Sequence, residues 1–254
     1  MASKSSRSRQ KAGTARLTSE TGDISAASSD DETPHYQGHR ERLRSRFLKG
    51  GAEALADYEM LELVLFAIPR RDVKPLAKEL IKHFGSFADV IAAPPEQLAK
   101  FRGLKDSGIV NMKAVHAAAL RLAKGRVLSR PVVSSWEALL DYCNAKMARS
   151  QVEEFRILFL DRKNSVIADE AHQRGTVDHT PVYPRKVVKR ALDLGASALI
   201  LVHNHPSGDP TPSRADIAMT REIVAAAKAL KIEIHDHLVI GNGKHASFKA
   251  LGLL

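Results

Sequence analysis

The chain has 254 residues, of which 44% are hydrophobic, so it can bury the cores of two domains of about 100 to 150 residues each. Its longest apolar run, residues 61–68 with Glu62 inside it, is far shorter than the roughly 20 residues that span a bilayer, and no apolar segment follows the N-terminus. These features predict a protein without a membrane span or a secretory signal. The single cysteine, Cys143, cannot form an intramolecular disulfide, and we expect it to be a buried thiol in a cytoplasmic protein.

The formal net charge of +10 is unevenly distributed along the chain. Residues 1–37 are net neutral, residues 38–126 carry +7 and residues 127–254 carry +3. A basic excess predicts an anionic partner such as nucleic acid, and it places that partner on the first half of the chain. A basic surface that serves only solubility explains the same charge equally well.

The first half of the chain is predicted to be a disordered tail followed by an all-α domain. Residues 1–37 contain eight serines and few large apolar side chains, so we expect them to be disordered. In residues 38–127 the apolar residues recur at helical spacing and are separated by turn signals such as Gly50-Gly51 and Pro94-Pro95. This pattern predicts about five short helices.

Residues 128–150 are predicted to be a linker and a leading helix that begins at Trp136, with Ser134 or Ser135 as its cap. From residue 151 the apolar period changes from helical to extended. The expected elements are a strand that includes residues 155–159, a turn at 161–164 and a strand at 165–170, followed by a helix at 184–194, a buried strand at 198–202, a helix at 213–231 and a strand at 232–240. Residues 151–254 should therefore form a mixed α/β domain.

The densest functional signal follows the buried strand. His203 and His205 are two residues apart, so their side chains project to the same side of the strand, and Asp216 lies in the first turn of the next helix. Two histidines and one aspartate form a three-ligand set for Zn²⁺ that leaves a fourth position open, as in catalytic zinc sites. Each fragment alone has a structural explanation, because Ser213 and Asp216 also have the spacing of a helix capping box.

The pattern His203-x-His205-Pro206 followed by Ser213-x-x-Asp216 resembles the JAMM (MPN+) metalloprotease signature, and the full string resembles the RadC family. The flanking segments 182–185, 236–241 and 38–43 agree with this resemblance, which covers about residues 38–254. It implies a JAB/MPN fold, in which helices flank a mixed sheet, preceded by a small helical domain. It also implies zinc bound by His203, His205 and Asp216, a serine that stabilises the oxyanion, here Ser213, and a glutamate base on the first strand.

The base must be chosen between Glu153 and Glu154, because successive strand residues point to opposite faces. The family's usual spacing of Glu, any residue, then Phe favours Glu153 ahead of Phe155. Glu154 stays an alternative, and both residues could instead be solvated charges at a strand end.

Two further motifs are weighed against this site. His235-Asp236-His237 repeats the His-x-His spacing without a carboxylate at the required distance, so we expect a structural or supporting role for Asp236 and His237. Residues 98–120 resemble a helix-hairpin-helix DNA-binding element, in which Lys105 replaces the second glycine of the hairpin. Side chains at this hairpin could contact phosphate instead, namely Lys100, Arg102 and Lys105.

The leading hypothesis is a zinc-dependent hydrolase of JAMM type that acts on a peptide or isopeptide bond of an unidentified protein or peptide. The loop between His205 and Ser213 is too short for a long substrate-gripping insertion, so a dedicated deubiquitinase is not expected. The alternative is a DNA-binding protein of repair or recombination, whose zinc domain either cuts nucleic acid or only holds the fold.

Overall fold

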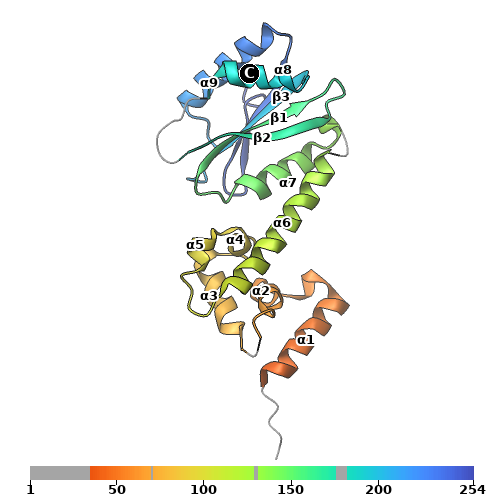
Figure 1. Ribbon diagram of the computed structural model, residues 1–254, viewed down its shortest axis with the longest axis vertical. Helices are drawn as coiled ribbons and strands as arrows, with labels where there is room; N and C mark the ends of the chain where they lie inside the picture. Colours follow the sequence, from red (N-terminus) through yellow and green to blue (C-terminus); the bar gives the residue numbers. More distant parts are fainter. Residues whose placement is uncertain (1–34, 70, 129–130, 176–181) are drawn as a thin grey trace, which may run out of the picture.

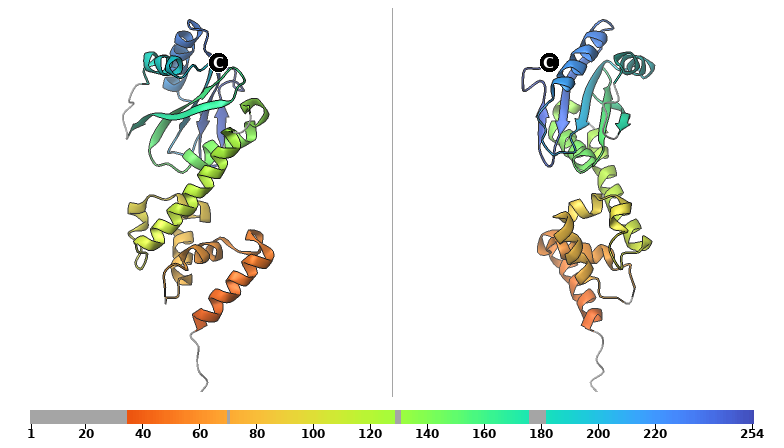
Figure 2. Two further views of the ribbon diagram at one scale, coloured as in Figure 1. Left: turned by 45° about the vertical axis from the view of Figure 1, so that its right-hand side comes forward. Right: turned by 90° about the vertical axis from the view of Figure 1, so that its left-hand side faces the viewer.

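The protein is described from a computed structural model that covers residues 35–69, 71–128, 131–175 and 182–254. A helical half, drawn in orange to yellow-green in Figure 1, precedes a half built on a single sheet, and one long helix runs between them. The two further views in Figure 2 show the same elongated arrangement. The predicted α/β class, with helices preceding a mixed sheet, is confirmed.

The helical half packs around one apolar core that includes Leu61, Leu80 and Met112. Its elements are α1 (His35–Gly50), the 3₁₀ helix η1 (Ala52–Ala54), α2 (Asp57–Leu65), α3 (Lys74–Phe84), α4 (Phe87–Ala92), α5 (Pro95–Leu98) and α6 (Asp106–Leu128). The expectation of about five short helices is corrected, because the described residues form six α-helices here and α6 is 23 residues long. No proline interrupts α6, and its many alanines favour a continuous helix.

The second half is a five-stranded sheet in the order β2-β1-β3-β4-β5. Its elements are η2 (Val132–Ser134), α7 (Trp136–Met147), β1 (Glu153–Leu160), β2 (Val166–Gly175), α8 (Pro184–Asp193), β3 (Ala198–Asn204), α9 (Arg214–Lys228), β4 (Glu233–Ile240) and β5 (His245–Ser247). Strand β1 is antiparallel to β2 and β3, whereas β3 and β4 are parallel and are joined by α9. The short β5 was not anticipated, since three residues are too few for a periodic signal.

Helices cover both faces of the sheet, as Figure 1 shows. One face carries α7 and the end of α6, and its core includes Leu158, Val202 and Leu139. The other face carries α8 and α9, and its core includes Ile157 and Leu201. Successive strand residues alternate between these two cores. In β1 and β3 the even-numbered side chains lie on the face covered by α7, and the odd-numbered side chains lie on the face covered by α8 and α9.

Helix α7 begins at Trp136 as expected, but the expected cap is not formed. Ser135 occupies the N-cap position without a side-chain capping bond. The hydroxyls of Ser134 and Ser135 instead donate to the carbonyl of Pro131, at 2.8 and 3.0 Å. Cys143 lies on the buried side of α7, and burial raises the pKa of its thiol to about 12.

Helix α6 belongs to both halves of the molecule. Ile109 and Met112 lie in the helical core, whereas Val127 lies in the core between α7 and the sheet. Beside this helix, Arg149 forms an ion pair with Asp89. None of the helices in the described ranges combines the length and the apolarity needed to cross a lipid bilayer.

Candidate metal centre

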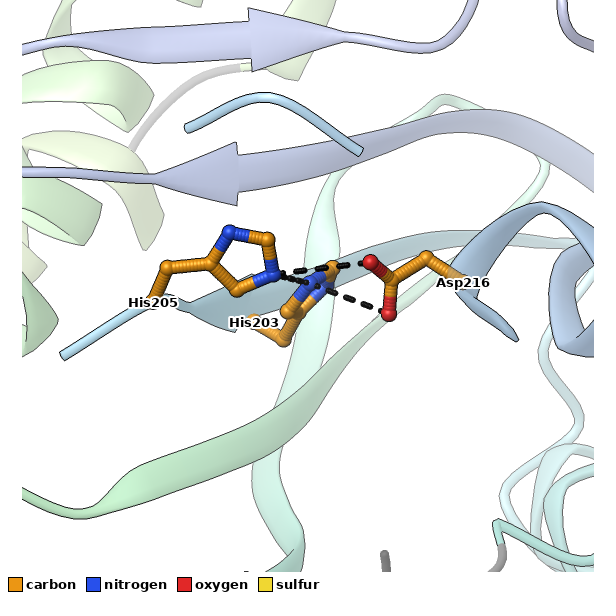
Figure 3. Close-up of side chains that lie close together, drawn as sticks. All are labelled: His203, His205 and Asp216. Carbon is orange, nitrogen blue, oxygen red and sulfur yellow. Dashed lines mark hydrogen bonds and ion pairs between the residues drawn. The ribbon is translucent and has the colours of Figure 1, made fainter. Parts of the chain in front are cut away.

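The end of β3 and the start of α9 bring three side chains together. His203 and His205 face the carboxylate of Asp216, as Figure 3 shows. The two Nε2 atoms are 3.0 Å apart, and each lies 3.4 Å from one carboxylate oxygen of Asp216. His203 and Asp216 are buried, while His205 is half-buried, so the group is accessible from one side. This is the only group of three or more potential ligands among the described residues.

A capping box holds the Asp216 carboxylate in place. The backbone N–H of Asp216 donates to Ser213 Oγ at 3.1 Å, and the Ser213 N–H donates to Asp216 Oδ2 at 2.7 Å. The Ser213 hydroxyl also donates to the same oxygen, at 2.6 Å. The cap does not exclude a ligand role for Asp216, because it orients the carboxylate toward the histidines.

The loop that connects β3 to α9 depends on close backbone packing. Gly241, directly after β4, lies against this loop, and a Cβ atom at Gly241 would come within 2.3 Å of the Gly208 carbonyl oxygen. Only glycine permits such an approach. The path from His205 to Ser213 is thus shaped by a second loop as well as by its own prolines.

A chain of buried hydrogen bonds fixes the tautomer of His203. Thr220 Oγ1 donates to the Asp216 carbonyl at 2.6 Å, so it accepts from His237 Nδ1 at 2.7 Å. His237 Nε2 then carries a lone pair and accepts from His203 Nδ1 at 2.8 Å. This assignment, which follows from the hydrogen-bond partners, leaves a lone pair on His203 Nε2, the atom that faces Asp216.

His205 is oriented in the same way by the loop. Its Nδ1 donates to the Asp209 carbonyl at 2.8 Å, so its Nε2 also presents a lone pair. Two imidazole lone pairs and a carboxylate therefore converge on one point, and they repel one another unless a cation or a proton lies between them. Two neutral imidazoles and one carboxylate are a donor set that suits zinc.

The ionisation of these groups agrees with a cation site. Burial opposes ionisation of Asp216, but in the absence of a cation, hydrogen bonding with His203 and His205, for which each imidazole would need a proton on Nε2, holds the pKa of its carboxyl well below its usual range. A hydrogen bond to Asp216, which the protonated imidazole alone can donate, raises the pKa of His205 despite partial burial, and the charge of Glu153 contributes to this rise. Burial lowers the pKa of His237 far below its usual value, so His237 is neutral.

The two candidate bases lie on opposite faces of the sheet. Phe155 pairs with His203 across the β1–β3 ladder, so Glu153, two residues earlier, shares the face of the histidines. Glu154 shares the other face with Arg156, and its carboxylate accepts a hydrogen bond from that guanidinium at 2.5 Å. The geometry therefore brings Glu153, and not Glu154, toward the three-residue group.

Other residues singled out in the sequence lie elsewhere. The side chains of Lys100, Arg102 and Lys105 are exposed at the turn between α5 and α6, in the helical half. Asp236 accepts from the N–H groups of His237 and Lys249, at 2.7 and 3.0 Å, which is a structural role.

His237 was expected to have a supporting role, but its contact with His203 was not anticipated, and neither was the part played by Thr220. Thr220 lies one helical turn after Asp216, on the same side of α9, and this spacing was the available signal.

Comparison with known proteins identifies relatives of the chain. A family model described as a RadC-like JAB domain matches residues 133–253. A UPF0758 protein from Rhodobacter capsulatus is 65% identical over 213 residues, which are 84% of this chain and 100% of that relative. A UPF0758 protein from Ruegeria pomeroyi is 58% identical over 223 residues, which are 87% of this chain and 100% of the relative. Matches of this length extend beyond the sheet half into the helical half.

Proposed function

Because the chain belongs to the UPF0758 (RadC) family and its RadC-like JAB domain contains the three-residue site, we propose that it is a zinc-dependent hydrolase of JAMM type. The observation that carries this proposal is the convergence of two Nε2 lone pairs and one ionised carboxylate on one point. Glu153 shares the same face of the sheet. Three protein ligands leave a fourth position open for water or substrate. The bond class that fits this chemistry and the family signature is a peptide or isopeptide bond.

The residues around the site divide the chemical work. Zinc would polarise the scissile carbonyl and lower the pKa of a bound water toward neutrality. Glu153 would accept a proton from the attacking water and pass it to the leaving amine. Ser213, exposed at the start of α9, would donate its hydroxyl to the developing oxyanion after releasing Asp216. The backbone N–H of Ser213 would continue to hold the carboxylate.

The proposal predicts that the full-length protein cleaves peptide bonds only with its metal. We expect zinc-loaded protein to hydrolyse a mixture of fluorescence-quenched peptides or a lysine isopeptide. A chelator should remove the activity, and added zinc should restore it. Cleavage that resists complete removal of zinc would contradict the mechanism. Cleavage of DNA but of no peptide would favour the nuclease alternative.

We further propose that the helical half binds nucleic acid through the turn between α5 and α6. Three exposed cationic side chains share this turn, and the Arg71 guanidinium lies against Gly103 beside them, where a Cβ atom would come within 2.2 Å of it. Gly103 has a φ of +93°, so only glycine readily provides both the turn and this approach. Four cations around one turn form a surface suited to phosphate.

Replacing Lys100, Arg102 and Lys105 together with alanine should weaken binding of the full-length protein to duplex DNA. The slope of log K against log salt should become less steep by about two to three units, at about 0.9 per lost phosphate contact. A fluorescently labelled duplex titrated at several salt concentrations measures this slope. An unchanged slope, or no binding by the parent protein at low salt, would leave the helical half as a partner-docking module.

A further inference from the structure

Asn204 lies between the two histidines of the site but faces the other side of the sheet. It is the last residue of β3, it is 1% exposed, and strand alternation directs its side chain toward α7. The main-chain ladder between β1 and β3 ends one residue earlier, at the pair Phe155 and His203. Beyond this pair, the side chain of Asn204, and not the main chain of β3, forms hydrogen bonds with the backbone of residues 150–154.

The Asn204 amide makes three hydrogen bonds to that segment. Its Oδ1 accepts from the N–H of Glu154 at 2.9 Å, and its Nδ2 donates to the carbonyls of Val152 and Ser150, at 3.2 and 3.4 Å. The partners determine which atom is oxygen and which is nitrogen, because a carbonyl cannot donate and an N–H cannot accept. Among side chains of this size, only an amide offers one acceptor and two donors in this geometry.

These bonds flank a single residue, Glu153. The carbonyl of Val152 belongs to the peptide group before Glu153, and the N–H of Glu154 belongs to the peptide group after it. The Glu153 side chain is exposed, so its placement depends on the backbone that carries it. A buried amide that holds both neighbouring peptide groups restricts the backbone dihedrals of Glu153.

We propose that Asn204 is a positioning residue that aims the Glu153 carboxylate at the metal centre. This inference rests on the proposed function, because it assigns a partner to the proposed base. The end of β3 thus contributes to the site from both faces of the sheet. His203 and His205 converge on Asp216 on one face, and on the other face Asn204 holds the segment that carries the proposed base.

The hydrogen bonds from Asn204 to the peptide groups on either side of Glu153 can be tested without any substrate. In Asn204→Ala, the amide of Glu154 should exchange with solvent about five- to tenfold faster than in the parent, while the protein keeps its zinc, since Asn204 is not a ligand. Ile200→Val, on the same strand and face, is the matched control and should leave Glu154 exchange unchanged. If Asn204→Ala does not fold, Asn204→Ser provides the same measurement with a polar side chain that cannot bridge both peptide groups.

The positioning role is tested by a double-mutant cycle on one fluorescence-quenched peptide that the parent cleaves. Asn204→Ala should lower kcat by about 10- to 100-fold with little change in KM, but it should cause no further loss when combined with Glu153→Gln. Unchanged exchange of Glu154, or losses that simply add, would overturn the inference. A zinc-loaded parent that cleaves no peptide would instead refute the proposed function. Hydrogen exchange of the Glu154 amide would then decide by itself whether Asn204 holds the backbone around Glu153.

Discussion

Glu153→Gln is expected to lower peptide hydrolysis by about 10²- to 10⁴-fold while leaving the zinc content unchanged. The amide of glutamine has nearly the shape of the carboxylate but cannot accept a proton from water. Glu153 lies on the histidine face of β1 and is not one of the three ligand side chains, so its loss should spare the metal. Steady-state kinetics with elemental analysis of the same samples measures both quantities.

The matched control is Glu154→Gln, one residue along the same strand. Its carboxylate faces α7 and bonds with Arg156, so we expect a small effect on kcat. The reverse ranking of the two variants would transfer the role of base to Glu154. Small effects from both would show that neither carboxylate moves the proton.

Loss of a metal ligand should reduce zinc affinity more than loss of a residue that only hydrogen-bonds to a ligand. His203→Ala and Asp216→Ala each remove one of three ligands and should reduce zinc from about one ion per chain to nearly none. His237→Phe keeps all three ligands but leaves the Nδ1–H of His203 without its acceptor, so zinc affinity should fall by about 10- to 100-fold. Competition with a chelating dye measures these affinities.

His235→Ala supplies the control for this series. His235 lies on the same strand as His237, two residues earlier, but it contacts Asn164 and Glu233 instead of the site. It should retain the parent's zinc affinity. Full zinc in Asp216→Ala would contradict the ligand assignment. A loss in His235→Ala equal to that in His237→Phe would contradict the supporting role of His237.

The periodic patterns in the sequence were sufficient to predict most of the sheet half. Strand β3 is buried on both faces, as its continuous apolar run indicates, and the turn before β2 uses Asn164 at a φ of 60°. The ligand spacing predicted the group His203, His205 and Asp216, which the structure brings together. Local spacing was informative here because one strand, one loop and one helix turn carry all three side chains.

Contacts between distant segments could not be predicted in this way. The contact between His237 and His203 joins residues 34 positions apart, and it exists because β3 and β4 are parallel neighbours. The bonds from Asn204 to Val152 and Glu154 likewise join the end of one strand to the start of another. No periodicity within one segment encodes such pairings, since they depend on the order of strands in the sheet.

The continuity of α6 also has a rotational consequence. Met112 and Val127 belong to different cores but to one helix, in which each residue turns the chain by about 100°. Inserting one residue between them would swing the helical half around the helix axis and carry Asp89 away from Arg149, whose ion pair lies next to the segment that leads to Glu153. The angular phase of α6 therefore sets which side of the helical half faces the segment from Arg149 to Gln151, which leads into β1.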